Sequence, residues 1–499
     1  NMETTIDKQI DIYINDYLIS NDNNSIIKLS DWLCKNYNQC NDIEKSVGLL
    51  LSFIGVQKNI ASCMFNCGYA ILSENNSFGI SLIEKAASLN YGKALKFLAN
   101  YYTFDDQKAL YYWQQCLNCD DIDKGEVYEN LGSLYFSIDN SDYKKGFEYL
   151  IIAADKYNMP YAKFRVASAY FYGEGIEQNT ERAFQYCFES ASLGCDSAQF
   201  WLGKDYYISD EFKLETDLEK AKYYLTLAYN QGNARAAYFL GLMYYFGEGV
   251  NKDYYTALNY FKNAKDEEIW QACAFLGQIY FEQENYFLAR IELEKSFLEN
   301  DILINGSTLA QIYKDGLQCE KDISKAIKCY EILIENKEAS ELDISYVADC
   351  YFYGNGVPQN LEKAAKYYDL IEYSNAYAKY QLGCIALDPT SSISSNRCIL
   401  YFEGAGAKGY TAAYQKLGDY FESINNMDRA FDYYVKCFEL GDAESAYKAG
   451  KVCETGTAAR QKNLAEAVNW YKKASEKGCE KATEELKHFK STLIGYRRI

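Results

Sequence analysis

Three short segments of the chain carry the pattern Gly-x-Gly, a residue type and spacing that can cradle a phosphate group. They are YFYGEGI at 170–176, YYFGEGV at 244–250 and YFYGNGV at 351–357. A glycine-rich phosphate loop follows a strand and adds either a third glycine or a lysine beside serine or threonine. Each segment here follows a predicted helix and lacks those residues. We therefore interpret the glycines as a tight turn between two antiparallel helices.

Other residues that could perform catalysis or bind a metal form no recognisable group. The single histidine, His488, lies in a segment dense in lysine and glutamate, where a solvated helical position is expected. Zinc sites need several cysteines or histidines at defined spacings. The pairs Cys63/Cys67 and Cys116/Cys119 have no matching second pair. The sequence therefore predicts a protein that is not an enzyme, with no metal site and no cofactor.

The composition predicts an ordered and acidic protein. The 499 residues are 48% hydrophobic, and 70 acidic against 51 basic residues give a net charge of −19. This charge argues against nucleic acid or an anionic membrane surface as the main partner. No run approaches the ~20 apolar residues of a membrane-spanning helix. The segment NMETTIDKQI shows no signal-peptide pattern, and 17 cysteines without an expected disulfide framework favour the cytoplasm or another reducing compartment.

The most informative pattern is a repeat with a period of about 35 residues. An apolar anchor residue, followed each time by glycine or alanine, recurs twelve times, and we number positions in each repeat from this anchor. The anchors are Cys67, Leu98, Leu131, Val166, Leu202, Leu240, Leu276, Leu309, Val347, Leu382, Leu417 and Ala449. Successive anchors lie 31 to 38 residues apart, which leaves room for two helices in each repeat.

The two helices of a repeat have different patterns. In the first helix, positions −4, 0, +1 and +4 fall on one stripe, as in Ala236, Leu240, Gly241 and Tyr244. The small residue at +1 allows the second helix to approach closely. The second helix begins after a polar capping residue such as Asn179. It often ends at glycine, which takes the left-handed C-cap conformation.

The combined pattern resembles that of the Sel-one-like repeat (SLR, or Sel1-like repeat), a relative of the tetratricopeptide repeat. In this chain it reads A-x-x-x-L-G-x-x-Y-x-x-G-x-G-V, a polar cap, then K-A-x-x-Y-Y-x-K-A-A-x-x-G, with the best local matches at 162–194, 236–264 and 446–478. The resemblance implies an all-α, right-handed superhelical solenoid of about twelve antiparallel helix-pair repeats. Several repeats lack Gly-x-Gly, and Ala386 stands where tyrosine is expected, which leaves the exact curvature open.

The two ends of the chain depart from the repeat. We expect residues 1–59 to form an N-terminal helical cap, with helices at about 4–19, 25–38 and 42–56; an independent domain is the alternative. Residues 60–479 form the predicted repeat array, and residues 480–499 are expected to form a C-terminal capping helix. Caps are needed because the terminal repeats of a solenoid would otherwise expose an apolar end.

Positions −5, −2, +2 and +5 lie opposite the core stripe of the first helix, and the tetratricopeptide resemblance suggests that they line a concave groove. Aromatic side chains concentrate there, and we predict that these residues contact a partner: Phe136, Phe164, Phe171, Phe200, Tyr207, Tyr238, Tyr245, Phe281 and Phe352. The alternative is that these rings pack against the adjacent repeat. Towards the C-terminus the same column becomes acidic at Glu422 and Glu454, which suits either a basic partner tail or a solvated face.

These features predict a non-catalytic scaffold or adaptor that holds a peptide or helix of a partner protein on its concave face. No nucleic-acid binding and no direct membrane insertion are expected. The alternative is an inhibitor or immunity protein that neutralises a basic toxin through its acidic surface. The resemblance does not choose between bacterial and eukaryotic adaptor roles, and the sequence does not indicate an oligomeric state.

Overall fold

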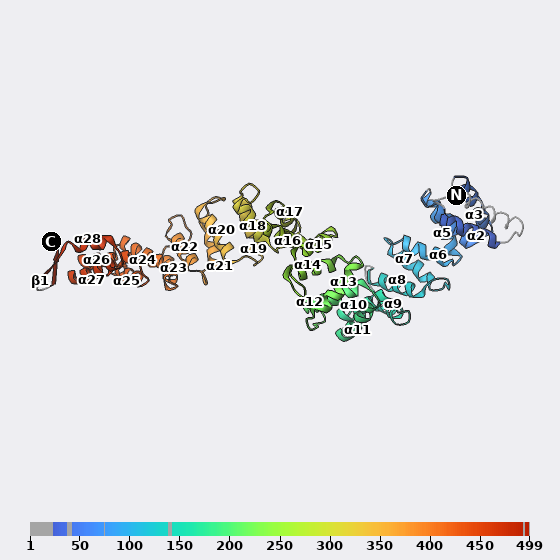
Figure 1. Cartoon of the computed structure of the whole chain (residues 1–499), viewed down its shortest axis with the longest axis horizontal. Coiled ribbons are helices and arrows are strands. Elements are labelled where there is room, and N and C mark those ends of the chain that lie inside the picture. The colour runs from blue at the N-terminus through green and yellow to red at the C-terminus, as the bar shows by residue number, and fades with distance from the viewer. Residues whose placement is uncertain (1–22, 37–41, 74, 138–141, 493–494, 499) are drawn as a thin grey trace. The chain divides into compact units, whose positions relative to one another are not determined.

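The computed structural model describes residues 23–36, 42–73, 75–137, 142–492 and 495–498. It consists of two compact units, Asn1–Ala264 and Lys265–Ile499. The helices from α4 to α27 form twelve consecutive pairs, six in each unit (Figure 1). The predicted all-α array of antiparallel helix pairs is confirmed. Of the helices described, none combines the length and apolar character needed to cross a membrane.

In the described part of the first unit, α2 (Asn23–Asn36) and α3 (Asp42–Gln57) precede the pairs. The first helices of its six pairs are α4 (Ala61–Ile71), α6 (Gly92–Tyr101), α8 (Lys124–Ser137), α10 (Pro160–Tyr172), α12 (Asp196–Ile208) and α14 (Ala234–Phe246). The second helices are α5 (Asn76–Ser88), α7 (Asp106–Cys116), α9 (Tyr143–Asp155), α11 (Thr180–Ser192), α13 (Leu218–Asn230) and α15 (Tyr254–Asp266).

In the second unit, the first helices are α16 (Gln271–Glu282), α18 (Gly306–Asp315), α20 (Glu341–Tyr353), α22 (Ala376–Leu387), α24 (Thr411–Ser423) and α26 (Ala443–Thr455). The second helices are α17 (Tyr286–Phe297), α19 (Ile323–Glu335), α21 (Leu361–Ile371), α23 (Arg397–Ala407), α25 (Met427–Glu439) and α27 (Leu464–Glu476). The chain ends with α28 (Glu480–Leu486) and the strands β1 (Phe489–Thr492) and β2 (Gly495–Arg498).

The predicted packing within a pair is confirmed. The anchor leucines are buried, and the glycine at +1 leaves space for a large side chain of the second helix. A Cβ on Gly241 would lie 2.6 Å from the Phe261 ring, so only a residue without a side chain fits. At the start of the second helix, the Asn179 side chain accepts a hydrogen bond from the Arg182 backbone N–H at 2.9 Å. These local devices explain why each period folds as one helix pair.

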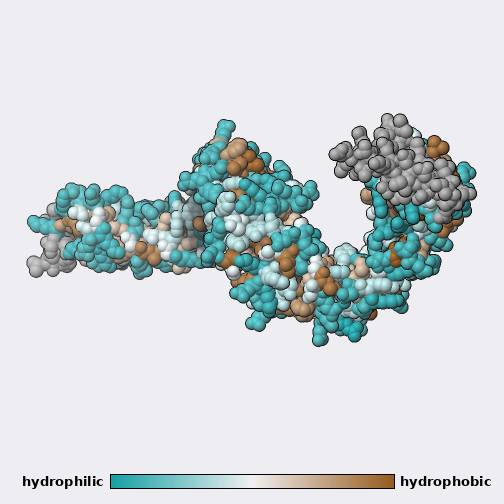
Figure 2. Space-filling model, turned by 45° about the vertical axis from the view of Figure 1, so that its right-hand side comes forward, coloured by the Kyte–Doolittle hydropathy of each residue, from teal (hydrophilic) through white to brown (hydrophobic). Residues whose placement is uncertain are grey.

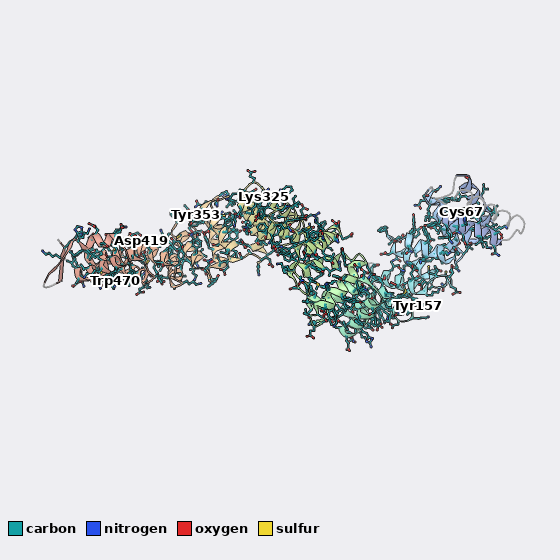
Figure 3. The ribbon with its side chains drawn as sticks, viewed as in Figure 1. Cys67, Tyr157, Lys325, Tyr353, Asp419 and Trp470 are labelled. Carbon is teal, nitrogen blue, oxygen red and sulfur yellow. The ribbon has the colours of Figure 1, made fainter. Side chains whose placement is uncertain are left out.

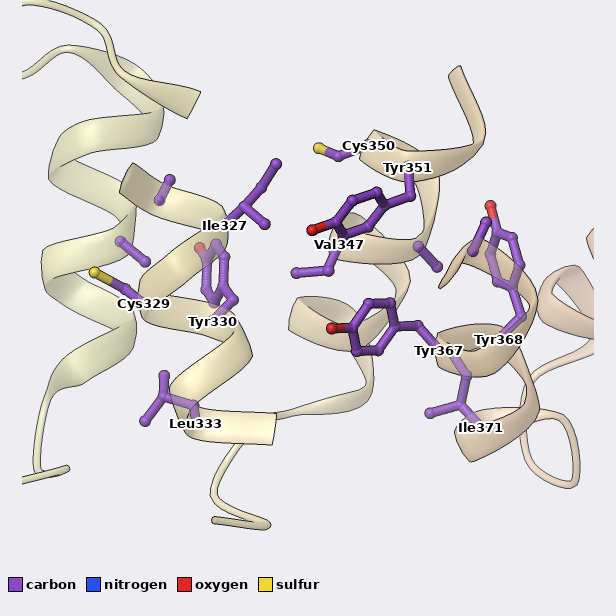
Figure 4. Packing of buried hydrophobic residues seen from close by; sticks show 14 of the residues in the cluster. Ile327, Cys329, Tyr330, Leu333, Val347, Cys350, Tyr351, Tyr367, Tyr368 and Ile371 are labelled. Atoms are coloured by element: carbon purple, nitrogen blue, oxygen red, sulfur yellow. The ribbon is translucent and has the colours of Figure 1, made fainter. Parts of the chain in front are cut away.

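Stacked tyrosine pairs recur at one position of the repeat and give a structural role to part of the chain's many tyrosines. In six repeats the tyrosine at +4 stacks on a tyrosine of the second helix, with ring planes within 23° of parallel and centroids 5.8–6.0 Å apart. The pairs are Tyr102–Tyr112, Tyr135–Tyr149, Tyr170–Tyr186, Tyr206–Tyr224, Tyr244–Tyr260 and Tyr351–Tyr367. In the Tyr351–Tyr367 pair (Figure 4), both hydroxyls donate to one oxygen of Glu331 at 2.8 Å. The pair thus buries apolar area while its polar ends remain hydrogen-bonded.

Within the first unit, the first helices of successive pairs contact one another. The contacts join α8 to α10, α10 to α12, and α12 to α14. We call these four helices, with α4 and α6 before them, the first-helix row. The residues of the first unit that the sequence predicted for partner binding lie on helices α8, α10, α12 and α14 of this row.

The N-terminal helices α2 and α3 pack against α4, the first helix of the first pair. Ile26 and Leu29 of α2 are buried, and the buried Asn66 amide on α4 donates to Ser30 Oγ at 3.0 Å. This packing is what a terminal cap requires. The helix predicted at 4–19 lies outside the described residues.

The C-terminal prediction of a helix over 480–499 is wrong beyond residue 486. After the short α28, the chain forms an antiparallel hairpin in which Phe489 pairs with Arg498. The hairpin folds back on α27: the Phe489 ring lies 5.8 Å from that of Tyr471, and Arg498 forms ion pairs with Glu454 and Glu485. These contacts favour the hairpin over continued helix.

Candidate partner-binding surface

The Gly-x-Gly segments are joints between repeats. Gly173 ends α10 in the left-handed conformation with φ +76°. Gly175, at φ +77°, lies so close to the preceding repeat that a Cβ would be 2.1 Å from the Tyr143 carbonyl oxygen. Gly249 likewise lies close to Leu218, the first residue of α13, where a Cβ would be 2.7 Å from the Leu218 side chain. A Cβ on Gly356 would be 2.4 Å from the side chain of Ile323, the first residue of α19. The second glycine therefore seats each loop on the second helix of the preceding repeat, which supports the turn interpretation and adds a contact that the sequence did not reveal.

All nine aromatic residues predicted to contact a partner are half-buried, and each ring touches another ring of its own or a neighbouring repeat. Four of them pack on a tyrosine of the second helix of their own repeat. This tyrosine is the first residue of the helix in three cases and lies within the helix in the fourth. Phe136 contacts Tyr143 at 5.3 Å, Tyr245 contacts Tyr254 at 5.2 Å, Phe281 contacts Tyr286 at 5.3 Å, and Phe352 contacts Tyr368 at 6.5 Å. These rings have support from inside the protein and partial access to solvent.

The other five converge on two rings of the first-helix row. The Phe164 and Phe171 rings both contact the Trp201 ring edge-to-face, with centroids 5.8 Å and 5.4 Å away. Phe239 is contacted by the remaining three, Phe200, Tyr207 and Tyr238, at 5.4–6.1 Å. The structure thus joins predicted residues of neighbouring repeats into two aromatic clusters. Phe281 and Phe352 belong to the second unit.

Position +6, directly after the predicted column, holds a large exposed apolar side chain in four of the first helices. Tyr172 is 62% exposed, Ile208 46%, Phe246 53% and Tyr353 65% (Tyr353 is labelled in Figure 3). These residues end their helices, so no following turn covers them. The sequence prediction did not include position +6. At Tyr172, Phe246 and Tyr353 a large apolar residue stands immediately before a glycine, and this was the signal that could have identified them.

Two of these exposed residues line a cavity in the first unit, which we call the α12–α14 cavity. It has a volume of about 430 Å³ and lies between the C-terminal ends of α12 and α14. Its lining residues are Tyr207, Ile208, Thr216, Leu218, Phe246 and Glu248. The Tyr207 hydroxyl donates to the Glu248 carboxylate, and burial together with this carboxylate raises the pKa of Tyr207. The site is mainly apolar, with one hydrogen-bonded polar pair at its wall. Figure 2 shows scattered hydrophobic patches on a mostly hydrophilic surface.

A second cavity, of about 260 Å³, lies at the opposite ends of the first helices and is lined by Glu129, Tyr161 and Asp196 among others. Burial, and the like charge of Glu126 and Asp123, raise the pKa of Glu129 to about 7. This carboxyl therefore changes protonation near neutral pH, unlike an ordinary glutamate.

The acidic column at the C-terminal end is occupied by contacts within the chain. Glu454 is 4% exposed; it pairs with Lys451 at 3.5 Å and with Arg498, and it accepts a hydrogen bond from Tyr471 at 2.8 Å. Asp419 (Figure 3) pairs with Lys448, and the Tyr434 hydroxyl donates to Glu422 at 2.6 Å. Glu454 is therefore neither a solvated residue nor a contact for a basic partner tail.

Seven segments of the chain match the Sel1 repeat family: residues 129–158, 160–195, 196–233, 234–267, 309–337, 344–370 and 443–479. Superkiller protein 3 of Schizosaccharomyces pombe is 25% identical over 210 residues, which are 40% of this chain and 15% of that protein. The chain thus spans only a small part of this relative.

Several solved structures are similar to the chain, including two SLR or Sel1 repeat proteins. One is a protective antigen of uropathogenic Escherichia coli strains with an SLR fold: 22% identity, 88% of this chain and 89% of that chain covered, TM-score 0.49. The other is a Sel1 repeat protein from Oxalobacter formigenes: 19% identity, 56% of this chain and 99% of that chain covered, TM-score 0.28.

Proposed function

The chain contains seven Sel1 repeats, and we propose that it is a non-catalytic scaffold that binds a segment of a partner protein along the first-helix row of its first unit. Repeat solenoids of this kind are generally protein-interaction scaffolds, whose stacked repeats provide an extended surface. The observation that carries the proposal is the α12–α14 cavity, where the exposed Ile208 and Phe246 border the half-buried Tyr207.

The chemistry of this cavity favours an apolar or aromatic side chain of a peptide or helix. Burying large apolar side chains in a preformed pocket supplies most of the binding energy at a typical protein interface. The Phe171–Trp201 and Tyr207–Phe239 contacts hold the surrounding rings in place, which lowers the entropic cost of binding. In this proposal Tyr207 contacts the partner, while the packed rings of Phe164, Phe171 and Phe200 support the surface.

The proposal can be tested by panning a phage-displayed library of 12-residue peptides against the full chain and two double variants. Ile208→Ser with Phe246→Ser removes the exposed apolar rim of the cavity. Tyr223→Ser with Tyr255→Ser is the matched control, because these tyrosines are 60% and 75% exposed but lie on the second helices α13 and α15. We expect peptides rich in apolar residues to enrich on the wild type and the control, and not on the cavity variant. Equal enrichment on all three would refute the proposal.

Salt dependence separates this function from neutralisation of a basic toxin. Apolar contacts weaken little as ionic strength rises, whereas attraction between an acidic surface and a basic protein is strongly screened. Raising the salt concentration from about 50 to about 500 mM shortens the Debye length roughly threefold. If the selected peptides lose most of their affinity over this range, the acidic-surface alternative is favoured.

A further inference from the structure

A third cavity of the first unit differs from the α12–α14 cavity in its polarity. It has a volume of about 260 Å³ and lies among α6, α7, α8 and α10. Its lining residues are Ala99, Asn100, Thr103, Ala109, Trp113, Asn130, Ser133, Leu134, Ser137 and Arg165. None of them is an aspartate or glutamate, although the chain has a net charge of −19. The one charged group at this cavity is therefore a cation.

That cation, Arg165, forms no ion pair with any residue in the described part of the chain. Its guanidinium carbon lies 5.1 Å from the centre of the Phe136 ring. Phe136 in turn packs on Tyr143 and fills the space that a side chain at Gly146 would occupy. The arginine thus rests on a fixed aromatic platform at the edge of the cavity, and its hydrogen-bonding edge has no acidic partner among the residues that the structure describes.

A second group in the cavity also lacks a partner. The Ser133 hydroxyl is buried and forms no hydrogen bond. The Thr103 and Ser137 hydroxyls, in contrast, donate to helix carbonyls of Asn100 and Leu134. A buried hydroxyl without a hydrogen-bond partner destabilises the protein, and a ligand that accepts its hydrogen bond removes this cost. Arg165 and Ser133 both offer donors, while Ala99, Ala109 and Trp113 form an apolar floor.

We propose that this cavity binds a carboxylate group of the partner segment, either an aspartate or glutamate side chain or a C-terminal residue. Arg165 supplies a charge-assisted, two-pronged hydrogen bond to the carboxylate, Ser133 donates to it, and the apolar floor takes the attached carbon chain. Phe136 acts as a positioning residue for the guanidinium. This inference rests on the proposed scaffold function and adds an anionic anchor to the apolar one.

Small probes test the site without a known partner. The full chain is titrated with N-acetylglutamate N-methylamide, which carries only a side-chain carboxylate, and with N-acetylglycine, which carries only a terminal one. N-acetylglutamine N-methylamide is the neutral match, and inorganic phosphate tests the other common anion. The readout is the NMR signal of the Arg165 Nε–H group, assigned by its loss in Arg165→Gln. We expect saturable shifts with at least one carboxylate and none with the neutral probe.

Variants give a second readout. We expect Arg165→Gln to weaken the binding of carboxylate-bearing library peptides by roughly 10- to 100-fold, and Ser133→Ala by about 5-fold. Ser133→Ala should leave the melting temperature of the free chain unchanged or raised, because it removes an unsatisfied hydroxyl; a merely structural serine would lower it. Arg235→Gln, an exposed arginine of α14 outside this cavity, is the matched control and should change affinity little.

The outcomes separate this inference from the scaffold function. If peptides bind but neither Arg165→Gln nor amidation of their carboxylates weakens binding, the carboxylate site is refuted and the scaffold function stands. If no peptide binds while the small carboxylates do, the site stands without the scaffold. Absence of a saturable shift, an equal shift with the neutral probe, or tighter binding of phosphate than of either carboxylate would overturn the proposal.

Discussion

Replacing Gly175 by alanine tests the claim that the second glycine of each Gly-x-Gly segment joins two repeats. Gly173→Ala is the matched control, because both glycines have φ near +76°. At Gly173 the nearest atom to a new Cβ is 3.5 Å away, an ordinary contact. At Gly175 the Cβ would lie 2.1 Å from the Tyr143 oxygen and 2.8 Å from the Lys144 nitrogen, both backbone atoms that cannot turn aside.

The expected magnitudes follow from these two environments. A left-handed conformation costs a non-glycine residue roughly 1–2 kcal/mol, and the loss of unfolded-state freedom returns about 0.4–1 kcal/mol. Gly173→Ala should therefore destabilise the chain by about 1 kcal/mol. Gly175→Ala adds an overpacking cost of about 1–3 kcal/mol, which gives about 2–4 kcal/mol in total.

Hydrogen exchange is the suitable assay, because repeat arrays open locally and one global midpoint averages over them. We expect Gly175→Ala to lower the protection of amides in α9 and α10, the helices that the joint connects, with little change in α5 and α6. Equal losses for Gly173→Ala and Gly175→Ala, or a loss spread evenly over the first unit, would refute the joint.

Three further predictions concern other parts of the chain. Phe171→Ser should destabilise the first unit by about 2–4 kcal/mol, because the ring packs on Trp201 and Phe212. Tyr172→Ser should have much less effect on thermal unfolding, because Tyr172 is 62% exposed. Glu129 has a folded pKa of about 7 against about 4.3 unfolded; its contribution to stability is complete below pH 4.3 and is lost as the pH rises through 7. Glu129→Gln should therefore remove roughly 1–3 kcal/mol of this pH dependence in denaturation measured from pH 5 to 8. Arg498→Ala should expose the C-terminal hairpin to trypsin, because Glu454 loses one of its cations.

The sequence predicted the repeat architecture well because each period contains its own folding signals. The anchor Leu240 and the small Gly241 act within the α14–α15 pair, and the cap Asn179 acts within the α10–α11 pair, so spacing along the chain was sufficient. The function of Gly175 was not predictable in the same way, since its critical neighbour, Tyr143, belongs to the preceding repeat and its approach depends on how repeats stack.

The candidate surface was predicted only in part for a related reason. Helical angles placed Tyr207 and Phe171 opposite the core stripe, yet they do not tell on which neighbouring ring each side chain rests. The exposed Phe246 was missed because the prediction used only positions −5, −2, +2 and +5, whereas Phe246 is the last residue of α14, which no following turn covers. The hairpin was missed because its stabilising contacts with Tyr471 and Glu454 come from other helices.

The dissociation constant of one selected peptide, measured by calorimetry on three forms of the chain, tests the scaffold function most directly. Loss of a central apolar contact typically costs 2 kcal/mol or more, so Ile208→Ser with Phe246→Ser should raise the dissociation constant by about 30-fold or more. Tyr223→Ser with Tyr255→Ser should leave it within about 2-fold. An unchanged dissociation constant for the cavity variant, with its fold intact by circular dichroism, would contradict the proposal that the partner binds at the α12–α14 cavity.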